Sequence, residues 1–333
     1  MSDVVYMEIF EQIHYSLSSV EARSDVKSLN MELKRCEVLI SDIITIRCIL
    51  NNPTRLIEFD LCEEITARSK RTNRKLKVTH VCGRDLEHKT ILSSVTSTCI
   101  FINQKFSARD WIAHFLSIFN GDHIDVVNFT NNTYHIDSLK SALANFQIKN
   151  YWIHHKFSVR NTLKVLREFP PAKEIDIQTL SFARPSHDLA LSQNFETFSL
   201  GMNRMLNLDQ ILLLNSKYIS ISSTMDSADI NMFLKIWIKG GNSRMKRLEV
   251  LYLDLDYFGS LDVARIMKGI NYDEVSGDVV KEVLMDCGNM YAFQLFSGNP
   301  RGGFEITRKR DGVKATIWFR ARPIPAIEMI VWS

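Results

Sequence analysis

Apolar and polar positions along the chain alternate in a way that predicts many short strands separated by amphipathic helices. Strand-like runs begin at residues 124, 150, 174, 196, 218 and 248, so successive starts differ by 22 to 30 residues. Apolar residues three and four positions apart predict helices, which here cover residues 108–119, 136–146, 159–169 and 206–214. One strand and one helix per interval of this length is typical of repeat proteins, whose neighbouring units bury each other's apolar faces.

The clearest single unit begins at Asp226 or Ser227, either of which can cap a helix. The apolar face of that helix consists of Ile230, Phe233, Leu234 and Trp237. Gly240–Gly241 should end it, because glycine adopts the left-handed conformation without steric cost. Residues 248–252 then form a largely buried strand. The position of Trp237 on the apolar face favours a packing role over ligand stacking.

These patterns predict an α/β fold, with an irregular leucine-rich-repeat-like solenoid of alternating strands and helices from residue 101 to about 285. A compact doubly wound α/β domain fits the same alternation and stays open as the alternative. Towards the amino end, β-rich runs predict a sheet or an irregular cap, and they cover residues 38–40, 43–48, 56–59 and 76–81.

The carboxy-terminal segment shows a different pattern. Residues 304–307 and 315–319 read as strands on either side of Asp311-Gly312, a strong turn signal for a β-hairpin. Residues 328–332 (EMIVW) predict a third strand.

Composition and charge restrict the possible functions. The 333 residues carry a formal net charge of +3, which is too small to indicate nucleic acid or membrane as a partner. No run approaches the ~18 consecutive apolar residues of a membrane span, and the first residues do not resemble a signal peptide. None of the six cysteines forms a CxxC pair, so we expect reduced thiols in an intracellular protein, cytoplasmic or nuclear.

No motif for catalysis, cofactor binding or metal binding stands out. Asp254, Asp256 and Asp262 do not fit the spacing of a calcium loop. His80, Cys82 and His88 lack an obvious fourth ligand for structural zinc. We therefore expect no enzyme activity, no cofactor and no metal.

A basic run at residues 67–77 (ARSKRTNRKLK) admits a nuclear-import or RNA-contact interpretation. It contains no aromatic residue for base stacking, which favours a solvated loop.

Residues 208–253 closely resemble the F-box-associated domain of type 2, a large family expanded in nematodes. The matching residues are Leu208, Asp209, Gln210, Leu212–Asn215, Tyr218, Ile219, Ile221, Asp229, Asn231, Phe233, Leu234, Lys235, Trp237, Ile238, Gly240, Leu248 and Glu249. The resemblance covers most of residues 30–333 and is dense over 200–255. We expect these motif residues to be mainly structural.

Residues 7–30 resemble the second half of an F-box, a small helical module that binds a Skp-type adaptor of a cullin ubiquitin ligase. The Leu-Pro opening and the first helix of the usual F-box are missing, so the resemblance is to a truncated, degenerate form. It implies adaptor contacts at Ile9, Phe10, Leu17, Val26 and Leu29.

The resemblance implies three regions: a partial F-box-like helical segment (1–30), a β-rich part (31–100) and the F-box-associated α/β repeat region (101–333). It also implies a substrate-recognition protein that links a target to a Skp/cullin ubiquitin ligase by positioning. An adaptor-free scaffold, or a decoy that has lost the F-box function, is the alternative. Nucleic-acid binding, supported only by the basic run, comes third.

Overall fold

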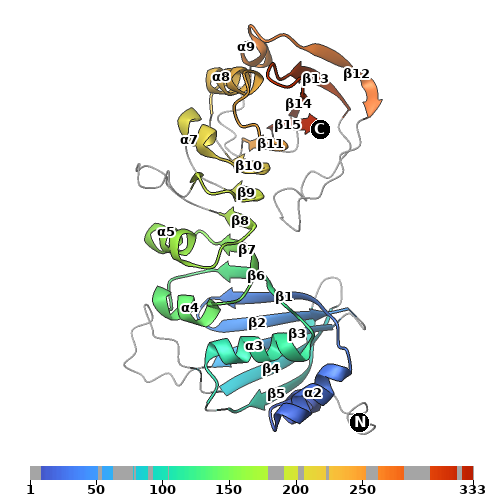
Figure 1. Cartoon of the computed structure of the whole chain (residues 1–333), viewed down its shortest axis with the longest axis vertical. Helices are drawn as coiled ribbons and strands as arrows, with labels where there is room; N and C mark the ends of the chain where they lie inside the picture. The colour runs from blue at the N-terminus through green and yellow to red at the C-terminus, as the bar shows by residue number, and fades with distance from the viewer. Residues whose placement is uncertain are drawn as a thin grey trace. The chain divides into compact units, whose positions relative to one another are not determined.

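The computed structural model of the protein describes residues 9–51, 55–62, 78, 80–88, 93–103, 105–178, 191–201, 206–222, 225–252, 262–280, 301–320 and 325–332. The chain divides into two compact units, Met1–Ala172 and Lys173–Ser333. Each unit contains a β-sheet with helices packed beside it, so the protein is a mixed α/β protein (Figure 1). The boundaries expected from the sequence, after residues 30 and 100, both lie inside the first unit.

The first unit joins the β-rich segment and the first strand–helix repeats in one sheet. Its elements are α1 (Ile9–Ser16), α2 (Val20–Ser28), β1 (Leu33–Ile40), β2 (Ile44–Leu50), β3 (Arg55–Cys62), β4 (His80–His88), β5 (Ser93–Phe101), α3 (Ala108–Ile118), β6 (Ile124–Phe129), α4 (Ile136–Leu143), β7 (Ile148–Ile153) and α5 (Val159–Glu168). The strands lie in the order β7-β6-β1-β2-β3-β4-β5. β1 is antiparallel to β2 and parallel to β6, which makes it the junction between the two parts.

Alternating burial along β1, β2 and β3 explains why helices cover one face of this sheet. Val38, Ile46 and Phe59 point to the same face because their strands pair in register, and all three are buried. Phe59 stacks on Phe115 of α3 with ring centroids 3.8 Å apart. The opposite face carries a cross-strand ion-pair ladder, in which Arg47 contacts Glu37 on β1 and Glu58 on β3.

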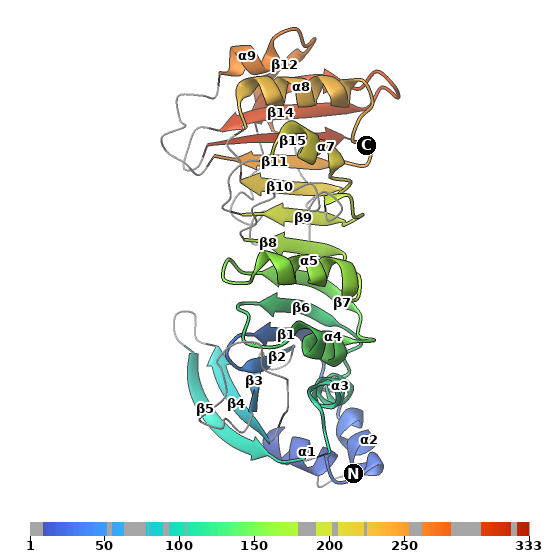
Figure 2. The ribbon, with the colours of Figure 1, turned by 90° about the vertical axis from the view of Figure 1, so that its left-hand side faces the viewer.

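The second unit combines four parallel strands with four antiparallel ones. Its elements are β8 (Glu174–Ile177), β9 (Thr197–Leu200), α7 (Leu208–Leu213), β10 (Tyr218–Ser222), α8 (Ser227–Ile238), β11 (Arg247–Leu251), α9 (Val263–Met267), β12 (Asp273–Val280), β13 (Arg301–Thr307), β14 (Lys314–Arg320) and β15 (Ala326–Trp332). β8, β9, β10 and β11 are parallel neighbours, and β15, β14, β13 and β12 continue the sheet as antiparallel strands. Figure 2 shows α7 and α8 beside the strands of this unit.

The carboxy-terminal prediction is confirmed. β13 and β14 form an antiparallel pair on either side of the Asp311-Gly312 turn, where Gly312 has a φ of +73°. The third predicted strand is β15, which lies between β14 and β11. The last strand of the chain, β15, therefore lies inside the sheet of this unit and not at its edge.

Candidate functional site

Helix α8 forms as the sequence predicts, and its ends are fixed by the expected residues. The side chain of Asp226 accepts hydrogen bonds from the backbone N–H groups of Ala228 and Asp229, both at 2.8 Å. Gly240 has a φ of +114°, so the helix ends in a conformation that favours glycine. The four residues of the apolar face, Ile230, Phe233, Leu234 and Trp237, are all buried.

Trp237 connects α8 to the β13–β14 turn. Its side chain is 0% exposed, and the guanidinium carbon of Arg308 lies 5.1 Å from its ring centroid. Arg308 Nε donates to Asp311 Oδ1 at 2.9 Å, and these hydrogen bonds hold the pKa of Asp311 below its usual value. The backbone N–H of Lys309 donates to the carbonyl of Ile238 at 2.8 Å. The turn is thus tied to the carboxy-terminal end of the helix.

Asn231 connects the middle of α8 to α9. Its side-chain amide donates to the carbonyl of Ile266 at 2.5 Å and to that of Lys268 at 2.9 Å. Asp262 caps α9 by accepting from the N–H of Arg265 at 3.0 Å. These bonds fix the start of the segment that runs from α9 into β12.

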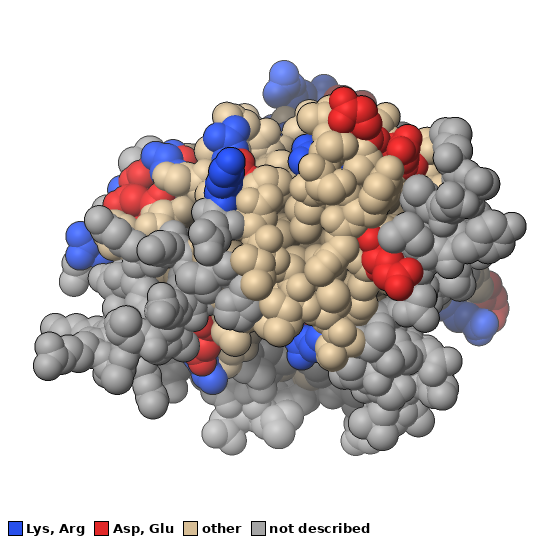
Figure 3. All heavy atoms as spheres, turned by 90° about the horizontal axis from the view of Figure 1, so that it is seen from below, with Lys and Arg blue, Asp and Glu red and all other residues tan. Residues whose placement is uncertain are grey.

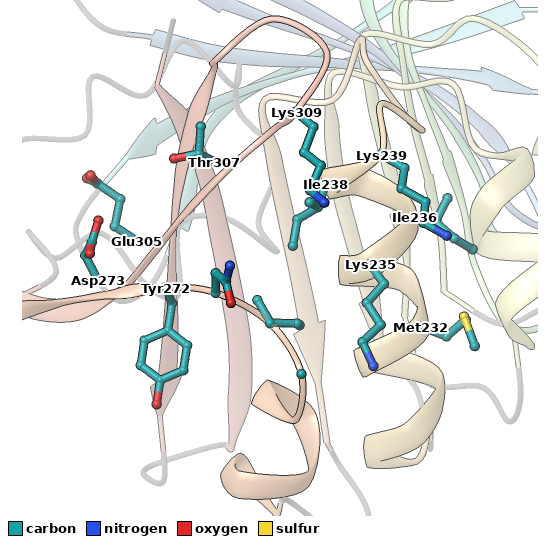
Figure 4. Close-up of a pocket in the computed structure, with 13 residues that line it drawn as sticks. Met232, Lys235, Ile236, Ile238, Lys239, Tyr272, Asp273, Glu305, Thr307 and Lys309 are labelled. Carbon is teal, nitrogen blue, oxygen red and sulfur yellow. The ribbon is translucent and has the colours of Figure 1, made fainter.

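A groove of about 720 Å³ lies between α8, the segment before β12, and β13 (Figure 4). Its volume is in the range of natural ligand pockets. The lining residues are Met232, Lys235, Ile236, Ile238, Lys239, Gly269, Ile270, Asn271, Tyr272, Asp273, Glu305, Thr307 and Lys309. The groove is therefore built where the Trp237 and Asn231 contacts hold three segments together.

Charge is distributed unevenly across the groove. Lys235, Lys239 and Lys309 line it, and none of the three forms an ion pair with a described residue. The acidic residues Asp273 and Glu305 lie on the opposite wall, and Figure 4 shows their carboxylates pointing away from α8.

Glu305 already has a cationic partner. Its Oε1 lies 2.7 Å from Nζ of Lys314, and this hydrogen bond raises the pKa of the lysine. The α8 side of the groove thus has a positive charge that the described groove residues do not neutralise.

Apolar surface lies next to these lysines. Met232 is 49% exposed and Tyr272 is 41% exposed. The ring of Tyr272 packs edge-on against Phe304, with centroids 5.1 Å apart. Ile270 is buried beneath the opening. The groove can therefore accommodate an apolar group beside an anionic one.

A second polar feature runs across the strands of this unit. Pairing in register places Asp176, Ser199, Ser220, Glu249 and Glu328 side by side. Burial raises the pKa of Asp176 to about 7, against an opposing hydrogen bond from Ser199. Burial likewise raises the pKa of Glu249, whose carboxylate accepts from Ser220 Oγ at 3.0 Å.

This polar row differs from a metal-binding cluster. No group of three His, Cys, Asp or Glu side chains close enough to hold a metal ion occurs among the residues that the structure describes. The row combines carboxylates with hydroxyls, and Ser220 Oγ donates its proton to a hydrogen bond with Glu249. The raised pKa values of Asp176 and Glu249 make the free energy of unfolding depend on pH.

The residues proposed for adaptor contacts lie mainly in the core of the first unit. Ile9, Phe10 and Val26 are buried, and Phe10 contacts Phe101 of β5 with ring centroids 5.9 Å apart. Leu17 and Leu29 are half-buried. The exposed apolar side chains of this region include those of Tyr15, Val20 and Ile100, which the resemblance to an F-box did not indicate.

The structure places several of the family-motif residues in helix caps, side-chain hydrogen bonds and the core. Gln210 forms a reciprocal capping box with Asn207 at the start of α7, and Asn215 donates to the side chain of Asn194. Leu248 is buried in β11, and Leu208 is half-buried while Asp209 is exposed on α7. Lys235 differs from the others because it lines the groove.

Sequence reasoning missed the groove as a site. The positions of Lys235 and Lys239 off the apolar face of α8 were the only local signal. The opposite wall comes from residues 269–273 and 305–309, which are distant along the chain.

Several sequence-based expectations fall outside the described residues. These are the basic run at 67–77, the acidic pair Asp254 and Asp256, and the side chains of His80 and His88. Cys62 and Cys82 are reduced cysteines, and the Cys62 thiol donates to the sulfur of Cys82 at 3.4 Å.

One known family matches part of the second unit. Residues 187–250 match a family model described as F-box associated. This range includes α7 and α8, and therefore the helix that forms one wall of the groove. Searches of curated proteins and of solved structures give no match. Among the described residues, no helix has the length and apolar character needed to cross a membrane.

Proposed function

We propose that this protein is a substrate-recognition subunit of the F-box class, which holds a target protein and links it to a Skp/cullin ubiquitin ligase. The observation that carries the proposal is the coincidence of the F-box-associated match with the helix that forms the groove. The protein acts inside the cell, in the cytoplasm or nucleus, and carries out no bond-making step itself.

The mechanism is positioning. A ligase modifies lysines that spend time near its active site, and binding a target to the same complex converts a bimolecular encounter into an effectively intramolecular one. A receptor of this kind needs one surface for the target and another for the adaptor. The groove beside α8 supplies the first surface in this proposal.

The end of the first unit supplies the second surface. Figure 3 looks onto the end that carries α1, α2 and β5, where much of the described surface bears no charged side chain. Val20 is 76% exposed there, and Tyr15 and Ile100 are also exposed. His14 Nε2 lies 3.2 Å from the carbonyl oxygen of Ile100, so α1 and β5 contribute to one surface. Exposed apolar surface of this kind marks interaction sites.

We also infer that the strand–helix alternation is an irregular leucine-rich-repeat-like arrangement. The parallel series β8, β9, β10 and β11 supports it, with α7 and α8 in two of the connections. The fold would then present successive helices and strand ends as a scaffold for the groove.

A binding measurement with a recombinant Skp-type adaptor tests the proposal. We expect the intact chain to bind, and Val20→Asp to weaken binding at least about tenfold by placing a charge in the apolar contact. Val279→Asp is the matched control, since Val279 is also an exposed valine but lies in the second unit. No binding by the intact chain, or equal loss in both variants, would contradict the adaptor assignment.

An adaptor-free scaffold or decoy is the second candidate. The observation that favours it is the burial of Ile9, Phe10 and Val26, three of the five residues proposed for adaptor contact. In that case α1 and α2 only cover the sheet of the first unit, and the groove still binds its partner. The adaptor measurement separates the two candidates.

A further inference from the structure

We propose that the groove beside α8 binds a short acidic segment of the target protein, in extended conformation, with a bulky apolar residue next to its acidic residues. The inference deepens the proposed function, because it names the chemistry of the recognised segment. It holds equally for a ligase receptor and for an adaptor-free scaffold.

The first argument is charge. Lys235 and Lys239 come from α8 and Lys309 comes from the β13–β14 turn, so two different elements direct cations to one groove. Positive charges that line one groove raise its electrostatic potential, which favours a negatively charged ligand there. Among the described residues, no acidic side chain forms an ion pair with any of the three lysines. Carboxylates of a bound segment would supply the missing counter-charge.

The second argument is spacing. Lys235 and Lys239 are four residues apart on one helix, which separates them by about 6 Å along its axis. In an extended peptide, side chains on the same face recur every second residue, at about 6.6 Å. Two acidic residues separated by one residue would therefore match the two lysines. A helical segment would match them equally at four-residue spacing, but the other wall of the groove is strand β13.

The third argument is the apolar surface. Met232 and Ile236 are four residues apart on α8, like the two lysines, so an apolar row runs beside a basic row. Tyr272 lines the other wall of the groove and packs edge-on against Phe304. Methionine adapts its shape to different partners, and tyrosine offers a flat apolar face. A leucine, methionine or phenylalanine of the segment would fit between them.

The acidic wall sets the direction of binding. Asp273 and Glu305 line the other wall, where Glu305 is paired with Lys314 and both carboxylates point away from α8, so that wall offers a carboxylate no cationic partner. The acidic residues of the segment must then lie towards α8, with the apolar residue near Tyr272. This arrangement rejects basic segments at the lysines.

The groove is held in shape before any ligand binds. Asn231 fixes the segment after α9, and the Lys309–Ile238 backbone bond fixes the turn. A preorganised site avoids the entropy cost of ordering its walls on binding. Asn231, a residue of the F-box-associated motif, therefore also stabilises one wall of the groove.

Selection of random peptides displayed on phage, with the intact chain as bait, tests the inference. Two acidic residues separated by one residue, beside a leucine, methionine or phenylalanine, should be enriched. Selected peptides, made with a fluorescent label, are then measured by anisotropy. We expect Lys235→Glu with Lys309→Glu to weaken binding at least about tenfold, and binding to weaken between about 50 and about 500 mM NaCl.

The matched control is Lys34→Glu with Lys105→Glu, which makes the same charge change on exposed lysines of the first unit. Circular dichroism and melting temperature check that both double variants fold. Enrichment without acidic residues, or equal binding by both double variants, would overturn the inference. The adaptor plays no part in this assay. If the peptide assay fails while the chain still binds the adaptor, only the groove assignment is wrong. If the chain does not bind the adaptor, the peptide result remains valid.

Discussion

Replacing Trp237 by alanine tests whether α8 is the structural centre of the groove. The indole is 0% exposed in the core of the second unit, and a tryptophan-to-alanine change in a core costs about 3–5 kcal/mol. The contact with Arg308 adds about 0.5–2 kcal/mol, since the guanidinium lies over the ring at 5.1 Å. We therefore expect the free energy of unfolding to fall by about 3.5–7 kcal/mol.

Urea unfolding followed by far-ultraviolet circular dichroism measures this change. The chain has two compact units, so the fit uses the transition that the substitution moves. Met232→Ala is the matched control, because Met232 lies on the same helix but is half exposed. It should change the free energy by less than about 1 kcal/mol.

Hydrogen exchange gives an independent reading of the same prediction. Amides of α8 and of the β13–β14 turn should lose protection together in Trp237→Ala, because the tryptophan ties the two elements through Arg308. A destabilisation below about 1 kcal/mol would refute the placement of this side chain in the core.

Three further changes have defined outcomes. Thermal denaturation should show that Asp176→Asn raises the free energy of unfolding relative to the unchanged chain. This increase should be about 2–3 kcal/mol larger at about pH 8 than at about pH 5. The folded-state pKa of Asp176 is raised to about 7, so its favourable contribution is lost as pH rises through that value; a pH-independent gain would contradict this. Asn231→Ala should cost about 1–3 kcal/mol in urea unfolding and expose residues 262–272 to hydrogen exchange, and unchanged protection would count against the tether. Phe10→Asp should unfold the first unit, lowering the melting temperature far more than Val20→Asp; similar melting temperatures would show that Phe10 is not in the core.

Local features of the fold were predictable from the sequence, because they depend on neighbouring residues. The Asp226 cap, the apolar face of α8 and the stop at Gly240 all act within one helix. The Asp311-Gly312 turn likewise selects a hairpin by its own backbone preference. Strands β5 and β12 were missed because they are rich in serine, threonine or acidic residues and lack a regular apolar alternation.

The candidate site was less predictable, because it depends on contacts distant in sequence. The apolar pattern of residues 9–26 indicates that two helices bury one face, but it does not identify the residues that pack against that face. The structure covers Phe10 with the β4–β5 edge of the sheet, where a side chain on Gly83 would clash with Phe101. The groove needs residues 232–239, 269–273 and 305–309 to meet, and no local pattern encodes that meeting.

The most direct test of the central claim, that this chain bridges a ligase and a target through separate surfaces, is quantitative mass spectrometry of complexes purified from cells. The baits are the intact chain, Val20→Asp, and Lys235→Glu with Lys309→Glu. The account predicts that the adaptor and cullin are lost with Val20→Asp alone, and that a set of ubiquitin-modified proteins with acidic segments is lost with the double lysine variant while the adaptor stays. Unchanged partners in both variants, or loss of the same partners in both, would contradict it.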